Sequence, residues 1–441
     1  MSDGNGRTAW AAAAAAVLLL LAAPAPAEEE TLAIRARRIL PVSGPPIEDG
    51  VVLVRGGKIE AVGKVEVPPL ARVIDAGEGW VCPGFVEAHS QVGLDRGNEQ
   101  QPVVPFVSTL DSLDPSAPAM EDQLREGVTT LLIIPGNETQ IGGQGILVKP
   151  KGRTVEEMLV RRAAGLKISL DPVRNTTRAG QIAAVRKAMK EAEDAREAAD
   201  RRRAEGAAGA GDVPDPEDGR RQALLDLLDG RLPAVIYAPL AMDVRNAFAL
   251  ADERKVRARF VLGPDAWRAA DLLRARQDAA GADAVLYALD PVLETVDRDD
   301  DTDEETVREV AGILRTAGVR FALTSDEGAW PSRYLWYQAA TAVRQGVPRD
   351  EALASITLRP ARFLGVADRV GSIEKGKDAN LLLLTGDPLA AGTWVDRVIL
   401  EGEVAYDRKD DRKLKRLVEG EKGAGQAQLR PGEPIPAGGG K

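Results

Sequence analysis

The sequence predicts an α/β protein: a (β/α)8 TIM-like barrel inserted into a small β-sandwich domain built from both chain ends. The 441 residues exceed one average domain but suit a barrel of about 250 residues with a companion domain. The central region alternates short apolar segments with helix-like segments, which is typical of a barrel. Short β-rich segments occur at both chain ends, and neither end alone has enough strands to bury a core.

Eight short apolar segments are the predicted barrel strands, because strands buried on both faces carry nearly continuous apolar runs. Helix-like segments lie between most of them. The clearest is 303–317, where Thr302 and Glu305 form a capping box and Gly318 ends the helix. The predicted barrel strands are 81–87, 128–134, 145–149, 166–170, 233–238, 258–262, 284–288 and 320–325.

The predicted β-sandwich domain combines residues 28–80 with residues 367–407, and the barrel occupies residues 81–366. Turn signals such as Gly56-Gly57 separate its strands. The predicted strands are 31–35, 51–54, 59–62 and 71–74 before the barrel, and 380–384, 395–400 and 404–406 after it. Because the strands before and after the barrel are too few to form separate domains, we expect them to form one composite domain.

The first 27 residues predict a secretory signal peptide. Arg7 precedes the apolar run 10–23, which is shorter than the roughly 20 residues needed to span a bilayer. Ala25-Pro26-Ala27 then fits a cleavage site. We therefore expect a periplasmic or secreted protein without membrane contact after cleavage, with an uncleaved amphipathic anchor as the alternative.

Composition limits the partners. A net charge of −10 and an aromatic fraction of 4% argue against nucleic-acid binding. The one cysteine, Cys82, cannot form an internal disulfide and predicts a packed thiol. The charged insertion 186–222 predicts a solvated helix with a mobile loop, or alternatively a partner-binding arm. Residues 408–441 predict a disordered tail. The sequence leaves a homo-oligomer open.

A polar cluster ends the first predicted barrel strand. Glu87, His89 and Gln91 occupy alternate positions, so an extended chain points all three side chains to one side. His89 is the only histidine of the chain. Polar side chains at the carboxyl end of a barrel strand are candidates for a functional site.

The stretch from Pro83 to Gln91 resembles the first barrel strand of the amidohydrolase superfamily, P-G-[FL]-[IV]-[DN]-x-H-x-H, with Gln91 in place of the second histidine. The order and spacing of further motifs resemble the imidazolonepropionase-like and dipeptidase-like branch of that superfamily. These motifs are 126–130, 142–145 followed by Lys149, 324–326, 357–365, and 371–373 with 376–380.

The resemblance implies one or two divalent metals at the barrel mouth, which lower the pKa of a bound water to about 7. It assigns Asp326 as metal ligand and general base, followed by Glu327 where the branch often has histidine. Tyr237 stands where the fifth strand usually carries histidine, and Gly263-Pro264 follow the sixth strand where another is usual. Lys167 and Lys149 are competing candidates for the family's carbamate-forming lysine.

These departures predict an exported protein with a degraded metal site that is non-catalytic and binds an unidentified small-molecule ligand or a partner; no cofactor is expected. In that case His89 is a hydrogen-bonded remnant, Lys167 forms a structural ion pair, and Asp326 caps loop amides or pairs with Arg333. The alternative is an active hydrolase of amide or other C–N bonds, or of a dipeptide. It would use one divalent Zn, Mn or Mg ion held by Glu87, His89, Lys167 and Asp326, with Gln91, Tyr237, Glu327 and Lys149 nearby.

Overall fold

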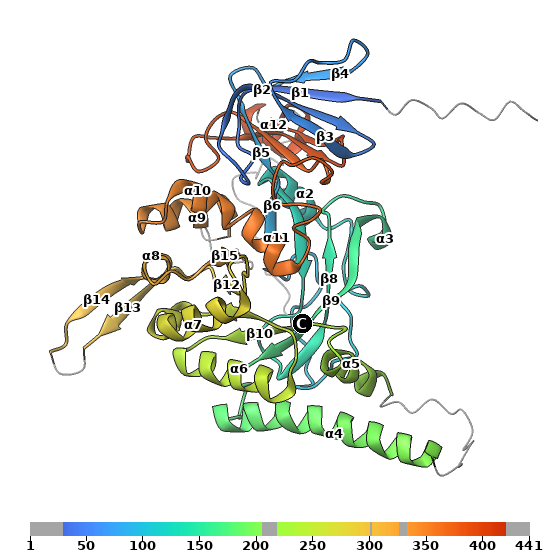
Figure 1. The fold of residues 1–441 in the computed structure, drawn as a ribbon, viewed down its shortest axis with the longest axis vertical. Coiled ribbons are helices and arrows are strands. Elements are labelled where there is room, and N and C mark those ends of the chain that lie inside the picture. Colours follow the sequence, from blue (N-terminus) through green and yellow to red (C-terminus); the bar gives the residue numbers. More distant parts are fainter. Residues whose placement is uncertain (1–29, 205–217, 300–301, 326–332, 420–441) are drawn as a thin grey trace, which may run out of the picture.

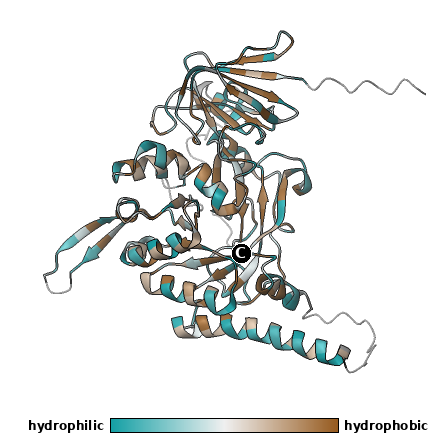
Figure 2. Cartoon of the chain, in the orientation of Figure 1, coloured by the Kyte–Doolittle hydropathy of each residue, from teal (hydrophilic) through white to brown (hydrophobic). Residues whose placement is uncertain are grey.

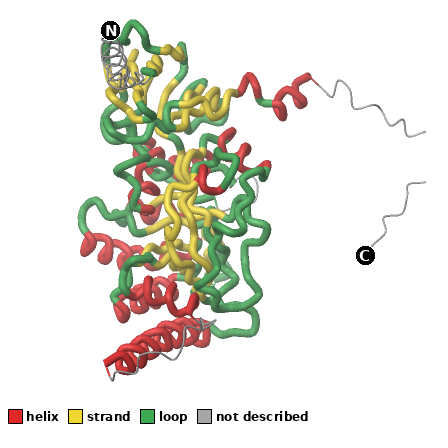
Figure 3. The backbone as a smooth tube through the Cα atoms, turned by 90° about the vertical axis from the view of Figure 1, so that its right-hand side faces the viewer, coloured by secondary structure: helices red, strands yellow, loops and turns green. Residues whose placement is uncertain are grey.

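The computed structural model describes residues 30–204, 218–299, 302–325 and 333–419 (Figure 1). Two eight-stranded sheets organise this part of the chain. One sheet, here called the composite sheet, lies at one end of the molecule, and helix α4 (Arg178–Ala204) lies at the other end (Figures 1 and 3). The predicted signal peptide lies outside the described residues.

The composite sheet joins strands from the two ends of the chain. Its order is β18-β17-β16-β5-β1-β2-β3, and β4 also pairs with β1. Leu32, Ile34 and Val52 are among the buried residues of its core. The predicted division into a sandwich is not confirmed. The strands are β1 (Leu32–Ile39), β2 (Ile47–Arg55), β3 (Lys58–Gly63), β4 (Arg72–Asp75), β5 (Trp80–Pro83), β16 (Leu381–Leu384), β17 (Val395–Leu400) and β18 (Glu403–Asp407).

The second sheet is a nearly closed barrel sheet, here called the barrel sheet, with the order β15-β12-β11-β10-β9-β8-β7-β6. Figure 2 shows that its strands are mostly hydrophobic, whereas α4 is mostly hydrophilic. The strands are β6 (Phe85–Ser90), β7 (Val128–Ile133), β8 (Ile141–Val148), β9 (Leu159–Ser169), β10 (Ala234–Ala238), β11 (Ala258–Leu262), β12 (Tyr287–Leu289) and β15 (Phe321–Leu323).

The barrel sheet differs from an all-parallel barrel at one strand. β8 runs antiparallel to both β7 and β9, while the other neighbours run parallel. Parallel neighbours need a long crossover connection, whereas only a short loop separates Ile133 from Ile141. The expectation of eight regular β/α units is therefore wrong in this region.

The described helices cover the barrel and link it to the composite sheet. They are α2 (Pro118–Arg125), α3 (Val155–Met158), α4, α5 (Asp218–Leu228), α6 (Ala241–Arg254), η1 (Pro264–Ala269), α7 (Ala270–Ala280), α8 (Val310–Thr316), α9 (Leu335–Arg344), α10 (Arg349–Ala354), α11 (Leu358–Leu364), η2 (Arg408–Asp410) and α12 (Arg412–Glu419). None of these helices has both the length and the apolar character required to cross a membrane.

The predicted strand 81–87 is two strands in two sheets. β5 pairs with β1 and β16, and β6 starts the barrel sheet directly after Gly84. The chain passes so close to Thr129 here that a Cβ at position 84 would lie 2.1 Å from its Oγ1. Glycine is therefore required where the chain leaves one sheet for the other.

The barrel sheet is closed by contacts across the gap between its edge strands β6 and β15. At one end, Val86 N donates to Ile356 O (2.9 Å) and Leu323 N donates to Ser355 O (2.8 Å). Helix α11, which follows this segment, contacts both edge strands. The loop between α10 and α11 thus bridges the edges and fixes the relative position of β6 and β15.

The predicted helix 303–317 is wrong for its first half. Strand β14 (Glu305–Glu309) pairs antiparallel with β13 (Glu294–Arg298), opposing Val307 to Val296, and only then does α8 begin. Two consecutive β-branched residues, Thr306 and Val307, favour the strand. The capping box is absent because the Thr302 hydroxyl accepts from Glu304 N within the hairpin turn.

Two further segments differ from expectation. The insertion contains α4 and α5, which pack together through buried residues such as Val185, Met189 and Leu224; the loop between them lies outside the described residues. The segment predicted as the start of a disordered tail forms η2 and α12. Asp411 caps α12 by accepting from Lys413 N (2.8 Å) and Leu414 N (3.1 Å).

Candidate functional site at the barrel mouth

Two predicted site residues meet inside the barrel at the carboxyl ends of their strands. His89 lies near the end of β6 and Lys167 near the end of β9; both side chains are fully buried. The Lys167 amino group is in hydrogen-bond contact with His89 Nε2. The contact joins strands 78 residues apart in sequence, and the spatial order of the barrel sheet creates it.

Glu87 links the two edge strands at the same end of the barrel. Its Oε2 accepts from Ser325 N (2.8 Å) and from Ser325 Oγ (2.5 Å), and its Oε1 accepts from His89 N (3.1 Å). Ser325 is the second residue after β15, so the carboxylate helps to close the barrel. A glutamate that accepts three hydrogen bonds has less lone-pair capacity left for a metal ion.

Tyr237 and Asp290 form a second polar pair beside Lys167. The Tyr237 ring lies 5.5 Å from the Lys167 amino nitrogen, and its hydroxyl donates to Asp290 Oδ2 at 3.3 Å. The tyrosine is the penultimate residue of β10, and the aspartate directly follows β12. The electron-rich face of the ring attracts a positively charged amino group, but it does not supply a metal ligand.

Two predicted residues have other partners. Gln91 packs against loop glycines beyond β6 and β7: its Oε1 would be 1.6 Å from a Cβ at Gly97 and 2.8 Å from a Cβ at Gly136. Lys149 lies at the junction of the two sheets, where its amino group is 3.0 Å from Asp378 Oδ2. Of the two candidate lysines, the structure therefore places Lys167 at the mouth.

The junction around Asp378 is an ion cluster. The Asp378 side chain is 1% exposed and pairs with Lys58, Lys149 and Arg369. Burial alone would raise the pKa of this carboxyl, but the hydrogen bonds and charges of its cationic neighbours lower it below its ordinary value. Glu401, also within reach of Lys149, completes the cluster.

Asp326 and Glu327 lie outside the described residues, directly after Ser325. Sequence reasoning missed two residues at the mouth, Ser325 and Asp290. Both are polar residues at the carboxyl end of a barrel strand, which is the signal that could have identified them.

Comparisons with known proteins identify the family. The profile of the amidohydrolase family matches residues 241–405. The crystal structure of an amidohydrolase from Thermotoga maritima MSB8 is 30% identical, covers 86% of this chain and 100% of its own, and superposes with a TM-score of 0.75. The chain belongs to the amidohydrolase superfamily.

Two curated relatives of this amidohydrolase-superfamily chain are more distant. Amidohydrolase tasK from Hapsidospora irregularis is 25% identical over 81% of the chain, but the chain spans only 40% of its length. Imidazolonepropionase from Pseudomonas entomophila (strain L48) is 24% identical over 76% of the chain and 87% of its own. These relatives carry the names of hydrolases.

The donor set at the mouth does not fit the two-metal centre that the superfamily resemblance implies. Among the described residues, no three histidine, cysteine, aspartate or glutamate side chains come together as a metal site. The chain has a single imidazole, His89, and its Nε2 is in hydrogen-bond contact with the Lys167 amino group. A ring nitrogen that is engaged by the lysine does not bind a metal ion at the same time.

Proposed function

We propose that this protein is a non-catalytic member of the amidohydrolase superfamily that binds a small molecule or a partner rather than hydrolysing a substrate. The contact between Lys167 and His89 carries the proposal. In this contact the only imidazole of the chain faces a lysine amino group, where a metal site would have a metal ion and its other ligands. Hydroxide attack near pH 7 requires a metal that acidifies its bound water, and this pairing disfavours such a metal.

The experiment combines metal analysis with activity. Protein purified without chelators should contain well below two metal ions per chain. N-acyl amino acids, dipeptides and cyclic amides should be hydrolysed no faster than in buffer, and Asp326→Asn should change neither result. Two tightly held metals per chain, together with hydrolysis that Asp326→Asn abolishes, would overturn the proposal.

The second candidate is an active hydrolase with one atypical metal. One observation favours it: Glu87, His89 and Lys167 gather at the mouth, and Asp326 follows Ser325, two residues beyond the end of β15, in the sequence. The relatives named as hydrolases add support. A single metal per chain, lost together with activity in both His89→Ala and Asp326→Asn, would establish this candidate in place of the first.

We also propose that the protein is exported to a periplasm or to the cell exterior. The apolar run 10–23 and the Ala25-Pro26-Ala27 site support this. Intact-mass measurement of protein from the native host should give a chain that starts near Glu28. A full-length chain beginning with Met1 in the cytosol would contradict export.

A further inference from the structure

A cavity lies at the opposite end of β6 from the mouth, between the barrel and the composite sheet. It has a volume of about 230 Å³. The buried side chains of Phe85 from β6 and Leu384 from β16 line it, and Trp336 from α9 and Trp394 before β17 form further walls. This cavity is small compared with drug-binding pockets of about 300–1,000 Å³, so its occupant is a small molecule.

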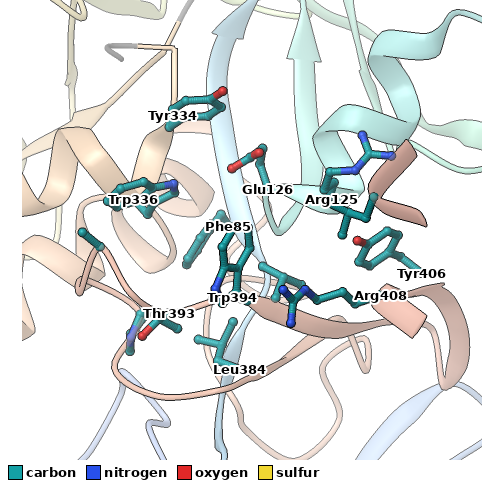
Figure 4. Close-up of a pocket in the computed structure, with 14 residues that line it drawn as sticks. Phe85, Arg125, Glu126, Tyr334, Trp336, Leu384, Thr393, Trp394, Tyr406 and Arg408 are labelled. Atoms are coloured by element: carbon teal, nitrogen blue, oxygen red, sulfur yellow. The ribbon is translucent and has the colours of Figure 1, made fainter. Parts of the chain in front are cut away.

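One carboxylate enters this aromatic cavity. Glu126 follows α2 directly, and Figure 4 shows its carboxylate among Tyr334, Trp336 and Phe85. The rings of Tyr334 and Trp336 stack with centroids 6.3 Å apart and planes inclined by 16°. A cavity lined by a carboxylate and several aromatic rings is suited to a cation, because both the charge and the ring quadrupoles attract it.

The charge of Glu126 is incompletely compensated inside the protein. Burial raises the pKa of this carboxyl, against the lowering effects of a hydrogen bond from Trp336 and of the charges of Arg333 and Arg125. No arginine or lysine among the described residues forms an ion pair with Glu126, whereas Arg125 donates to Asp411 at 2.6 Å and also pairs with Asp122.

The neighbouring rings already attract cations of the chain itself. The Arg408 guanidinium lies 4.5 Å from the Trp394 ring centre, and that of Arg333 lies 5.1 Å from the Tyr334 ring centre. Arg408 and Arg125 line the cavity together with Glu126, but the Arg408 guanidinium lies over Trp394 and Arg125 is paired with Asp411 and Asp122. The cavity is therefore an aromatic cage in which both cationic side chains already have partners and one carboxylate remains to bind a cation.

We propose that this cavity binds a small organic cation, an aromatic or aliphatic amine, whose ammonium group pairs with Glu126 and whose apolar part contacts Phe85, Trp336 and Trp394. The site is separate from the barrel mouth. It is independent of whether the mouth is catalytic, so the failure of one proposal leaves the other unchanged.

The test compares three probes of similar shape: benzylamine, benzyl alcohol and benzoate. Calorimetric titration of the full chain at pH 7.5 should show benzylammonium binding at least tenfold more tightly than benzyl alcohol, with benzoate weakest. Glu126→Gln should weaken benzylammonium binding at least tenfold and leave benzyl alcohol unchanged. Trp336→Leu should weaken both probes, because it removes a ring face.

The matched control is Glu121→Gln, which removes the same charge from an exposed position of α2 outside the cavity. It should leave benzylammonium binding within twofold of the wild type. Equal affinities for benzylammonium and benzyl alcohol would overturn the proposal. Equal losses of benzylammonium affinity in Glu126→Gln and Glu121→Gln would also overturn it. Tighter binding of benzoate than of benzylammonium would overturn it too, because it would show that the cavity binds an anion through Arg408.

Discussion

Two buried lysines, at two ends of the barrel sheet, have opposite surroundings. Lys149 lies at the sheet junction against the carboxylates of Asp378 and Glu401. Lys167 lies at the mouth against an imidazole and the ring of Tyr237. A lysine among carboxylates stabilises the fold, whereas a buried lysine against a neutral ring system marks a site shaped by function. The same residue type therefore has a structural role at the junction and a role in the candidate site at the mouth.

The largest effect is expected at the junction. Asp378→Asn should lower the free energy of unfolding by about 3 kcal/mol, because it leaves the buried Lys149 without its main countercharge and keeps Lys58 and Arg369 close by. Urea unfolding measures this. The control Glu401→Gln changes a side chain that is 53% exposed and should cost less than about 1 kcal/mol. Equal costs would show that the junction is not organised around Asp378.

Acid should weaken the junction in the same way. The folded-state pKa of Asp378 is lowered, so its stabilisation is present above the ordinary carboxyl pKa of 3.8 and is lost as pH falls below about 4 toward the folded-state value. Unfolding free energies measured between pH 7 and pH 3 should therefore converge for the wild type and Asp378→Asn. A constant difference over this range would exclude Asp378 as the titrating group.

The two lysines should respond differently to the same substitution. Lys149→Met should cost about 1–2 kcal/mol, because it removes buried charge-assisted hydrogen bonds. Lys167→Met should cost less, about 1 kcal/mol, because it removes the hydrogen bond to the His89 imidazole. Thermal unfolding of both variants measures the difference, and the reverse order would contradict the roles assigned to the two lysines.

A smaller effect of opposite sign is expected at the cavity. Burial raises the folded-state pKa of Glu126, so folding is penalised as pH rises above the ordinary value of 4.5 and through the folded-state pKa. Glu126→Gln should therefore stabilise the protein at pH 7 by less than about 1 kcal/mol and have no effect near pH 4. Destabilisation at pH 7 would mean that the hydrogen bond from Trp336 and the charges of Arg333 and Arg125 outweigh the cost of burying the carboxylate.

The smallest effect is expected from added metal. Stabilisation by a ligand follows RT ln(1 + [L]/Kd), so a weak site gives little. Zn²⁺ or Mn²⁺ at micromolar concentrations should shift the melting temperature of the wild type by less than about 1 °C. A large shift that disappears in His89→Ala would restore the mouth as a metal centre.

The sequence was a good guide where local patterns determine the structure. The apolar strand runs, the motif around His89 and the strands shared by the two chain ends all appear in the described structure. It misled at 303–317, because the pairing of Val307 with Val296 is a tertiary contact that overrides helical periodicity. It left Lys167 and Lys149 unresolved, since only the antiparallel direction of β8, which carries Lys149 to the other end of the sheet, shows which lysine reaches His89.

The composite sheet cannot be completed until its last strands have been synthesised. Val81 of β5 pairs with Leu383 of β16, and all of the barrel lies between them in the sequence. At roughly 5–20 residues per second, the ribosome needs roughly 15–60 s to make the intervening roughly 300 residues. During that time one edge of β5 has no β16 partner, and long-range pairing of this kind is slow even in a finished chain. The nascent protein therefore depends on being kept from aggregation until its last strands emerge.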